Sequence, residues 1–231
     1  MIGDRRVIAI VPARAGSEGL PGKNVRPLAG RPMIDWTLDA AAASQLIDRV
    51  LVSTDDPRVA ERVTPPAEII DRPAELSGSQ ASVIDAIAHA LGAADEGPDY
   101  VVLLQPTSPL RTAADIDAAI RLCDETGAPA VLTVSPTLKP ARFHGVLGDD
   151  GRLTLDPPRA GEAVVLNGAV YVGRPERLFA DRTFLTEETR VLVMPPERGW
   201  DIDTLYDFVI AEALFPHAQA FAATGMPAIR R

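Results

Sequence analysis

A glycine-rich loop that carries two cations follows an apolar segment near the start of the sequence. Residues 7–24 are Val-Ile-Ala-Ile-Val-Pro-Ala-Arg-Ala-Gly-Ser-Glu-Gly-Leu-Pro-Gly-Lys-Asn. Glycines let backbone N–H groups approach a polyphosphate and adopt the positive φ angles that turn several donors inward, while Arg14 and Lys23 supply countercharge. The spacing fits neither the G-x-G-x-x-G fingerprint nor the G-x-x-x-x-G-K-[ST] loop, because Asn24 replaces the Ser or Thr. The residues favour a nucleotide loop of a third kind, and an ordinary turn with solvated charges is the alternative.

Polar side chains also gather at other points of the sequence. Asp55-Asp56 and the segment 105–111 follow apolar runs, Asn167-Gly168 lies inside a late strand pattern, and the segment 200–204 precedes the last helical pattern. Ligands of open α/β sheets collect at the carboxyl ends of the strands, so we expect these segments to meet at one edge. Each also has a structural interpretation, since Asp55 can cap a helix and Asp203 or Thr204 can act as an N-cap. Their joint placement at one edge favours a site.

Apolar β-rich runs alternate with segments of helical period, which is typical of a mostly parallel sheet covered by helices on both faces. We expect strands over 7–11, 50–53, 100–105, 130–134, 163–172 and 191–194. We expect helices over 32–43, 59–63, 81–91, 113–125 and 204–214. Pro, Gly and Asp punctuate residues 135–161 and predict an insertion of hairpins that projects from the sheet, and residues 216–231 are expected to form an irregular tail. The sequence thus predicts one Rossmann-like α/β domain over residues 1–231.

Composition narrows the class of protein. The 231 residues include 32 acidic and 23 basic side chains, and the net charge of −9 argues against nucleic acid or an anionic membrane as the main partner. The single cysteine, Cys123, excludes an intrachain disulfide and fits a reducing compartment. The apolar run from Val7 is too short for a signal peptide, and we find no membrane span. We therefore expect a cytoplasmic protein.

Five segments together carry a family resemblance. They are residues 14–24, Arg72-Pro-Ala-Glu-Leu76, Leu104-Gln-Pro-Thr-Ser-Pro-Leu-Arg111, Asn167-Gly-Ala-Val-Tyr171 and Asp201-Ile-Asp203. In this order they resemble the motifs of the acylneuraminate cytidylyltransferases, or CMP-sialic acid synthetases, and the resemblance runs from about Val7 to Leu214. Enzymes that activate 3-deoxy-manno-octulosonate share the first loop but carry an aspartate where this chain has Gln105. The resemblance therefore points to the nine-carbon sugar branch.

The resemblance implies a nucleotidyltransferase that moves CMP from CTP to the anomeric hydroxyl of a sialic-acid-like sugar and releases pyrophosphate. Catalysis of this kind is mostly positioning and electrostatic stabilisation. The family pattern places Lys23 on the α-phosphate, and Arg14 and Ser17 on the β- and γ-phosphates. It makes Asp201 and Asp203, hard oxygen donors two residues apart, ligands of Mg²⁺. A helix cap and a surface acid are the alternative for that pair.

The same resemblance assigns the recognition of the two substrates. Asn24, Arg72 and Ser82 are implied to bind cytosine and ribose. The residues implied to bind the acid sugar are Gln105, Lys139, Asn167 and Tyr171. Tyr171 fits core packing equally well. No histidine is convincing as a general base, so activation of the nucleophile would fall to the metal.

Two departures from the family pattern keep alternatives open. Glu18 stands where the family commonly has Lys, so either Glu18 faces solvent or nucleotide binding is weakened. The segment 135–161, which in the family builds the dimer and contributes to the neighbour's sugar site, is short and lacks the expected Arg-Gln pair. We expect a homodimer. Legionaminate, pseudaminate or a deaminated sialic acid are alternative sugars, and Glu18 alone suggests a non-catalytic nucleotide-binding relative.

Overall fold

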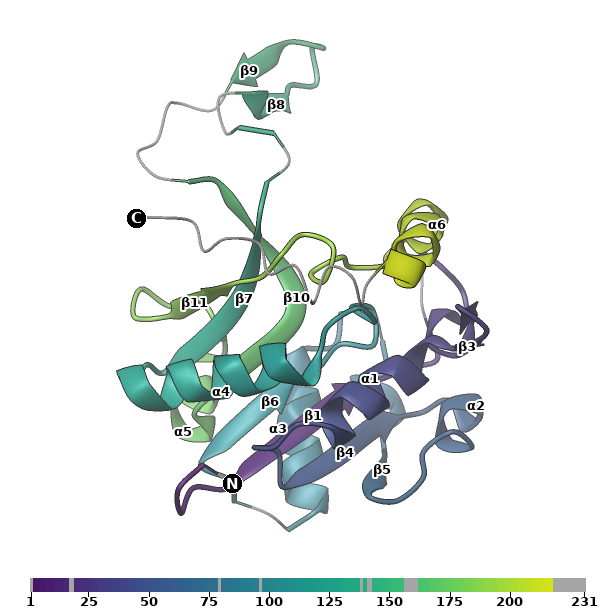
Figure 1. Cartoon of the computed structure of the whole chain (residues 1–231), viewed down its shortest axis with the longest axis vertical. Coiled ribbons are helices and arrows are strands. Elements are labelled where there is room, and N and C mark those ends of the chain that lie inside the picture. Colours follow the sequence, from purple (N-terminus) through teal and green to yellow (C-terminus); the bar gives the residue numbers. More distant parts are fainter. Residues whose placement is uncertain are drawn as a thin grey trace.

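A seven-stranded sheet with the strand order β11-β7-β10-β6-β1-β4-β5 forms the centre of the computed structural model (Figure 1). The structure describes residues 2–16, 19–78, 80–95, 97–137, 139–140, 143–155 and 162–217. The strands of the sheet are β1 (Val7–Pro12), β4 (Arg49–Thr54), β5 (Ala67–Asp71), β6 (Tyr100–Leu103), β7 (Ala130–Pro136), β10 (Val164–Gly173) and β11 (Arg190–Val193). β10 runs antiparallel to β6 and β7, and the other pairings are parallel.

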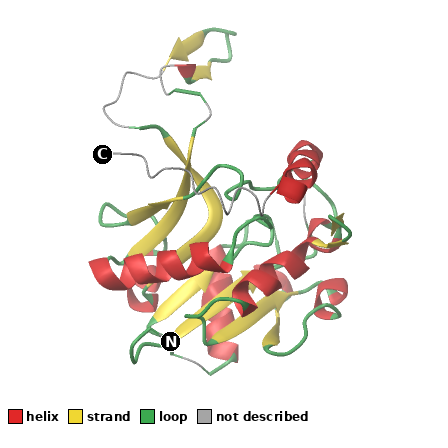
Figure 2. Ribbon diagram, viewed as in Figure 1, coloured by secondary structure: helices red, strands yellow, loops and turns green. Residues whose placement is uncertain are grey.

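Helices cover both faces of this sheet (Figure 2). The helices are α1 (Met33–Ala42), α2 (Pro57–Ala60), α3 (Val83–Ala93), α4 (Ala113–Thr126), α5 (Pro175–Asp181) and α6 (Leu205–Leu214). Along β1, Val7, Ala9 and Val11 pack in one core cluster with residues of α1 and α4, and Ile8 and Ile10 pack in a second cluster with residues of α3 and α5. Burial on both faces explains why β1 is a continuous apolar run. The predicted α/β fold class is confirmed.

A third cluster of buried apolar side chains ties α6 to the loops at the carboxyl edge of the sheet. Phe208 and Ala211 of α6 pack with Leu20, Leu28 and Ile202. Leu28 belongs to a short antiparallel ribbon formed by β2 (Pro27–Leu28) and β3 (Arg31–Pro32). The cluster therefore fixes the segment before α6 against the loop that follows β1.

The segment after β7 contains a hairpin that projects from the body of the molecule (Figure 1). Its strands are β8 (Gly145–Leu147) and β9 (Leu153–Leu155), which pair antiparallel. Residues 156–161 of the predicted insertion lie outside the described residues. Of the predicted tail, only Pro216 and His217 are described, and they lie in a 3-10 turn, η4 (Phe215–His217).

Several boundaries differ from the sequence-based prediction. The helix expected over 59–63 is α2, which begins at Pro57 because Asp56 accepts a hydrogen bond from the Arg58 N–H and Pro57 suits the first helical position. The capping alternative for Asp55 therefore does not hold. Thr204, not Asp203, is the N-cap of α6. β5 and α5 were not predicted. None of the helices in the described ranges has both the length and the apolar character needed to cross a bilayer.

Candidate active site

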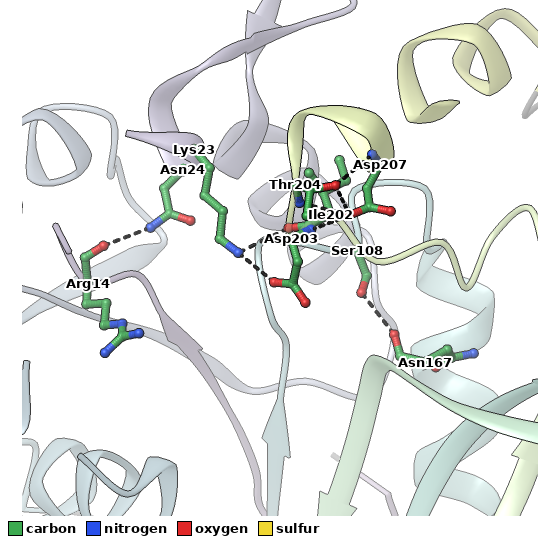
Figure 3. Close-up of polar contacts among 9 residues, drawn as sticks. All are labelled: Arg14, Lys23, Asn24, Ser108, Asn167, Ile202, Asp203, Thr204 and Asp207. Carbon is green, nitrogen blue, oxygen red and sulfur yellow. Dashed lines mark hydrogen bonds and ion pairs between the residues drawn. The ribbon is translucent and has the colours of Figure 1, made fainter. Parts of the chain in front are cut away.

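The loop that follows β1 is fastened to the end of β4. The Asp55 carboxylate accepts a hydrogen bond of 2.8 Å from the Ala15 N–H, and the Thr54 hydroxyl donates to the Ala13 carbonyl at 2.6 Å. The buried Asn24 amide donates to the Arg14 carbonyl at 3.1 Å (Figure 3). These three bonds hold the backbone around Arg14. The sequence predicts that Ser17 contacts phosphate, and Glu18 is the residue that departs from the family pattern. Both lie outside the described residues.

A cavity of about 450 Å³ opens where β1, β5 and β6 end; we call it the first cavity. Its wall includes Arg14, Lys23, Asn24, Arg72, Ser82 and Asp203. Gln105, just after β6, borders it as well. The structure thus brings together six of the residues predicted for the nucleotide, the phosphates and the metal, with one residue predicted for the sugar.

Lys23 and Asp203 form an ion pair across this cavity (Figure 3). Lys23 lies in a 3-10 turn, η1 (Lys23–Val25), and its Nζ donates to Asp203 Oδ1 at 2.9 Å and to the Ile202 carbonyl at 3.1 Å. Gly19 makes this approach possible, because a Cβ atom there would lie 2.4 Å from the Asp203 carbonyl oxygen. The two loops, which are distant in sequence, are therefore in backbone contact.

Arg14 and Arg72 place two further positive charges at the first cavity. Arg14 Nη1 donates to the Gly78 carbonyl at 2.6 Å, and Arg72 donates from Nε to Ser53 Oγ at 3.0 Å and from Nη2 to the Ser53 carbonyl at 2.9 Å. Burial lowers the pKa of Arg72; the Asp55 carboxylate opposes this shift and the Arg14 guanidinium adds to it. An anion bound between the two arginines would relieve their repulsion.

Ser82 has a structural role in addition to its place in the cavity wall. It is the N-cap of α3, and its Oγ accepts a hydrogen bond from the Ile84 N–H at 3.2 Å. The helix thereby begins at the cavity.

Asp201 does not border the first cavity but lines another, also of about 450 Å³; we call it the second cavity. Burial raises the pKa of Asp201; the Thr107 hydroxyl and the Lys23 ammonium oppose this shift, and the Asp203 carboxylate adds to it. Asp201 Oδ1 is buried and has no hydrogen-bond partner among the described residues. A cation near this oxygen would offset the cost of burying it.

The two carboxylates fit Mg²⁺, which commonly takes one or two protein carboxylates together with waters and substrate phosphates. Within the described ranges there is no group of three or more His, Cys, Asp or Glu side chains that could hold a metal on its own. An ion held by these two carboxylates would therefore need further ligands from water or substrate.

Asn167 is held at a bulge of β10. The pairing of β10 with β7 shifts register between Leu166 and Tyr171. Asn167 Oδ1 accepts from the Thr133 hydroxyl at 2.6 Å, and its Nδ2 donates to Ser135 Oγ at 2.9 Å. Asn167 borders the second cavity, as does Lys139. The following Gly168 has φ +68°, and a Cβ there would lie 3.3 Å from Gln105 Nε2.

Tyr171 is partly buried and lines neither cavity. Its ring packs against Phe184 with the ring centroids 5.6 Å apart. Burial raises the pKa of its hydroxyl, and the Asp201 carboxylate raises it further, so the hydroxyl lies within electrostatic reach of Asp201.

Two residues at this edge were given no catalytic or ligand-binding role in the sequence-based prediction. Asp55 holds the loop after β1, as described above. Arg111 is fully buried and donates from Nη2 to the Gln105 carbonyl, which closes the loop after β6. Burial lowers the pKa of Arg111 to about 9, and the Asp201 and Asp115 carboxylates oppose the shift. Both residues follow predicted strands, which indicated that they lie at this edge of the sheet. The residues that their side chains contact could not be inferred from the neighbouring sequence.

Comparison with known proteins identifies the family. Residues 8–145 match the cytidylyltransferase family. The chain is 32% identical over 226 residues to the CMP-N,N'-diacetyllegionaminic acid synthase of Legionella pneumophila, covering 90% of this chain and 96% of that one. It is 31% identical over 217 residues to the N-acylneuraminate cytidylyltransferase of Escherichia coli O18:K1:H7, covering 89% of this chain but only 51% of that one.

Solved structures support the fold. A CMP:2-keto-3-deoxy-manno-octonic acid synthetase complexed with CTP superposes with a TM-score of 0.68 at 19% identity, covering 92% of this chain and 99% of that one. The chain belongs to the cytidylyltransferase family, and the resemblance to the acylneuraminate cytidylyltransferases is confirmed. Because the relatives are named as synthases and transferases, an enzyme is favoured over a non-catalytic relative.

Replacing Ser82 separates its two roles. We expect Ser82→Ala to lower the free energy of unfolding by about 1 kcal/mol, because the N-cap of α3 is lost. Ser82→Asp keeps a capping oxygen but adds a negative charge to the first cavity, so we expect near-normal stability and weaker CTP binding. Urea unfolding and calorimetric titration with CTP measure the two effects. Thr112→Ala is the control, because it removes the N-cap of α4 and Thr112 does not border the first cavity. An unchanged CTP affinity in Ser82→Asp would contradict the placement of Ser82 beside the nucleotide.

Proposed function

We propose that this cytidylyltransferase transfers CMP from CTP to the anomeric hydroxyl of a nine-carbon acid sugar of the sialic-acid type, releasing pyrophosphate. The observation that carries the proposal is the gathering of Arg14, Lys23 and Arg72 around one cavity, with Asp203 beside Lys23. Three cations at the carboxyl edge of a parallel sheet suit a triphosphate. The names of the relatives support CTP and an acid sugar as the substrates.

In the proposed reaction the anomeric oxygen attacks the α-phosphorus of CTP. The new oxygen–phosphorus bond forms as the bond to the leaving pyrophosphate breaks, and the hydroxyl proton is lost. Lys23 would stabilise the charge on the α-phosphate, and Arg14, with Ser17, would hold the β- and γ-phosphates, where a guanidinium grips two oxygens at once. Asn24, Arg72 and Ser82 would position the cytosine and ribose.

The Lys23–Asp203 ion pair suggests how the site accepts its ligands. Lys23 is mostly buried, with 15% of its side chain exposed, whereas 72% of the Asp203 side chain is exposed. An incoming phosphate would replace Asp203 as the partner of Lys23. The Asp203 carboxylate would then be available, together with Asp201, to bind Mg²⁺. When bound, Mg²⁺ would neutralise phosphate charge and lower the pKa of the attacking hydroxyl.

The acceptor sugar would enter from the second cavity. Asp201, Lys139 and Asn167 border this cavity, and Gln105 lies between Gly168 and the first cavity. Lys139 would meet the sugar carboxylate. A legionaminate-type sugar is the second candidate, because a relative of which the chain covers 96% is named for the CMP derivative of such a sugar.

The function is tested by pyrophosphate release from CTP and Mg²⁺ across a panel of nine-carbon acid sugars. We expect turnover with at least one sugar, and little turnover when UTP, ATP or GTP replaces CTP. 3-Deoxy-manno-octulosonate is the eight-carbon control. If that sugar alone reacts, the nine-carbon assignment is wrong; if CTP binds to no detectable extent, the nucleotide assignment is wrong as well.

Asp201→Asn tests the metal assignment. We expect the rate in saturating Mg²⁺ to fall by about 100-fold or more, because the variant loses a ligand of the ion that would neutralise transition-state charge. The pKa of Asp201 is higher in the folded than in the unfolded chain. The free energy of unfolding therefore falls as the pH rises from the unfolded toward the folded pKa, and the ionised, buried carboxylate destabilises the fold above that range. Without metal at neutral pH, the variant should therefore melt at the same or a higher temperature.

Asp181→Asn, outside both cavities, is the control for Asp201→Asn. Full activity of Asp201→Asn in Mg²⁺ would contradict the assignment of Asp201 as a metal ligand.

We also propose a homodimer that forms through the β8–β9 hairpin. Leu147 is 71% exposed and Leu153 is 65% exposed, and such a contiguous apolar surface is costly in water. We expect light scattering to give twice the mass of the chain, and Leu147→Arg to shift the protein toward the monomer. Leu185→Arg, at a leucine that is 57% exposed outside the hairpin, should leave the dimer intact. A wild-type monomer at micromolar concentration would refute this assembly.

A further inference from the structure

We propose that Arg198 is a positioning residue of the reaction, which sets the place of Asp201 through a buried ion pair with Asp115. The inference rests on the proposed function, because it concerns how the acidic segment of the same site is held. Arg198 precedes Asp201 by three residues. It is not among the described residues that line either cavity, so it would act on the reactants only through Asp201.

The pair between Arg198 and Asp115 has the two-bond geometry of a guanidinium on a carboxylate. Arg198 Nε donates to Asp115 Oδ2 at 3.0 Å, and Arg198 Nη2 donates to Asp115 Oδ1 at 2.9 Å. Only 16% of the Arg198 side chain and 7% of the Asp115 side chain are exposed. A forked pair of this kind fixes direction as well as distance, which a lysine ammonium cannot do. The pair therefore joins two segments of the chain in one relative orientation.

Asp115 is itself held at the start of α4. Its Oδ2 also accepts from the Thr112 N–H at 2.9 Å and from the Thr112 hydroxyl at 2.8 Å, as part of the capping box of the helix. The fully buried Ile116 and Ile120 pack α4 into the same core cluster as one face of β1. The Asp115 carboxylate therefore gives Arg198 a reference point that is tied to the core of the fold.

The backbone that follows Arg198 is fitted against β7 and the bulge of β10. Gly199 makes this fit possible, because a Cβ atom there would lie 2.3 Å from Ser135 Oγ and 2.4 Å from Asn167 Nδ2. Arg198 and Gly199 both donate from their N–H groups to the Pro195 carbonyl at 3.1 Å, which forms a tight turn. The turn that Arg198 fastens to α4 therefore leads directly into the wall of the second cavity.

Asp201 depends on this support because part of its carboxylate is not held by contacts of its own. Its Oδ1 atom is buried and has no hydrogen-bond partner among the described residues. The next residue, Ile202, is anchored by burial and by the bond from its N–H to the Thr107 carbonyl at 2.8 Å. Ile202 therefore fixes the backbone after Asp201, and Arg198 fixes the backbone before it.

A second buried cation, Arg111, shows what would follow if the charge of Arg198 were removed. Arg111 Nε and Nη1 have no hydrogen-bond partner in the described part of the chain, and the Asp201 and Asp115 carboxylates attract the guanidinium. Without Arg198, the Asp115 carboxylate would draw Arg111 toward it. Arg111 would then leave the carbonyl of Gln105, a residue that borders the first cavity. Arg198→Lys is therefore the cleaner variant, because it keeps a positive charge beside Asp115.

The inference is tested by the Mg²⁺ dependence of Arg198→Lys. Calorimetric titration with CTP and no sugar, at free Mg²⁺ concentrations above that of CTP, measures metal binding apart from turnover. We expect the half-saturating Mg²⁺ concentration to rise and kcat to fall, each by about 10- to 100-fold, because a residue that orients a metal ligand is changed. The KM for CTP at saturating Mg²⁺ should change little, because Arg198 lies outside the first cavity.

A double variant shows whether the effect runs through Asp201. In an Asp201→Asn background, Arg198→Lys should change the Mg²⁺ dependence and kcat by no more than about twofold, because the carboxylate that Arg198 positions is already gone. Equal losses in the two backgrounds would overturn the inference.

Arg62→Lys is the matched control. Arg62 donates from Nε to Asp35 Oδ1 at 3.3 Å and from Nη2 to Asp35 Oδ2 at 2.6 Å, and neither residue is among those described as lining a cavity. We expect this variant to lower the melting temperature without a change in the Mg²⁺ dependence. If Arg198→Lys also changes the melting temperature alone, or if both variants shift the Mg²⁺ dependence equally, Arg198 has only a structural role and the inference fails.

A second variant decides the question if Arg198→Lys does not fold. Arg198→Met combined with Asp115→Asn removes both charges of the pair, so that neither is left buried without its partner. We expect the same loss of Mg²⁺ binding, and an unchanged Mg²⁺ dependence would overturn the inference. If no acid sugar reacts in the presence of CTP and Mg²⁺, the proposed function itself fails, and this result is distinct from turnover that is insensitive to Arg198.

Discussion

The burial of β1 on both faces is the constraint on which the site depends. Its residues from Val7 to Val11 are fully buried, and the strand is paired in parallel with β4 on one side and β6 on the other. A shift of register would move its side chains to the wrong faces of the sheet, so the position of the strand is strongly specified. The loop after β1 therefore starts at a fixed point, and Thr54 and Asp55 of the neighbouring strand hold it there.

The acidic segment reaches this fixed loop from the far end of the sequence. The Ile202 N–H donates to the Thr107 carbonyl at 2.8 Å, and the Ile202 side chain is fully buried in the cluster that includes Leu20 and Phe208. An apolar residue between two acids thus anchors both of them. Burial of the Ile202 side chain fixes the position of the backbone here, and this backbone in turn positions the carboxylates of Asp201 and Asp203.

Much of this arrangement was predictable because apolar runs and helical periods are local signals. β1, β4, β6, β7 and β10 and the longer helices lie close to where the sequence predicts them, and the ends of the parallel strands β1 and β6 marked the edge of the sheet where the first cavity opens. β5 escaped prediction because it is a half-exposed edge strand of five residues without clear alternation. Asp56 caps α2 because Pro57 occupies the first helical position and because Asp55 holds the loop after β1. The sequence of the two aspartates alone does not show which of them is the cap.

The two cavities are built by different parts of the chain. The first draws mainly on the loops after β1, β5 and β6, and the second draws on β7, on the first half of β10 and on residues 196–201. The match to the family ends at residue 145, before β10 begins. If the second cavity holds the acceptor, as proposed above, the two substrates would be bound by largely separate parts of the chain, with Asp203 bordering one cavity and Asp201 the other. Exchange of the segment from β7 to the β10 bulge would accordingly be a route by which one nucleotide-binding half acquires a new acceptor while β1 and its loop keep their structure.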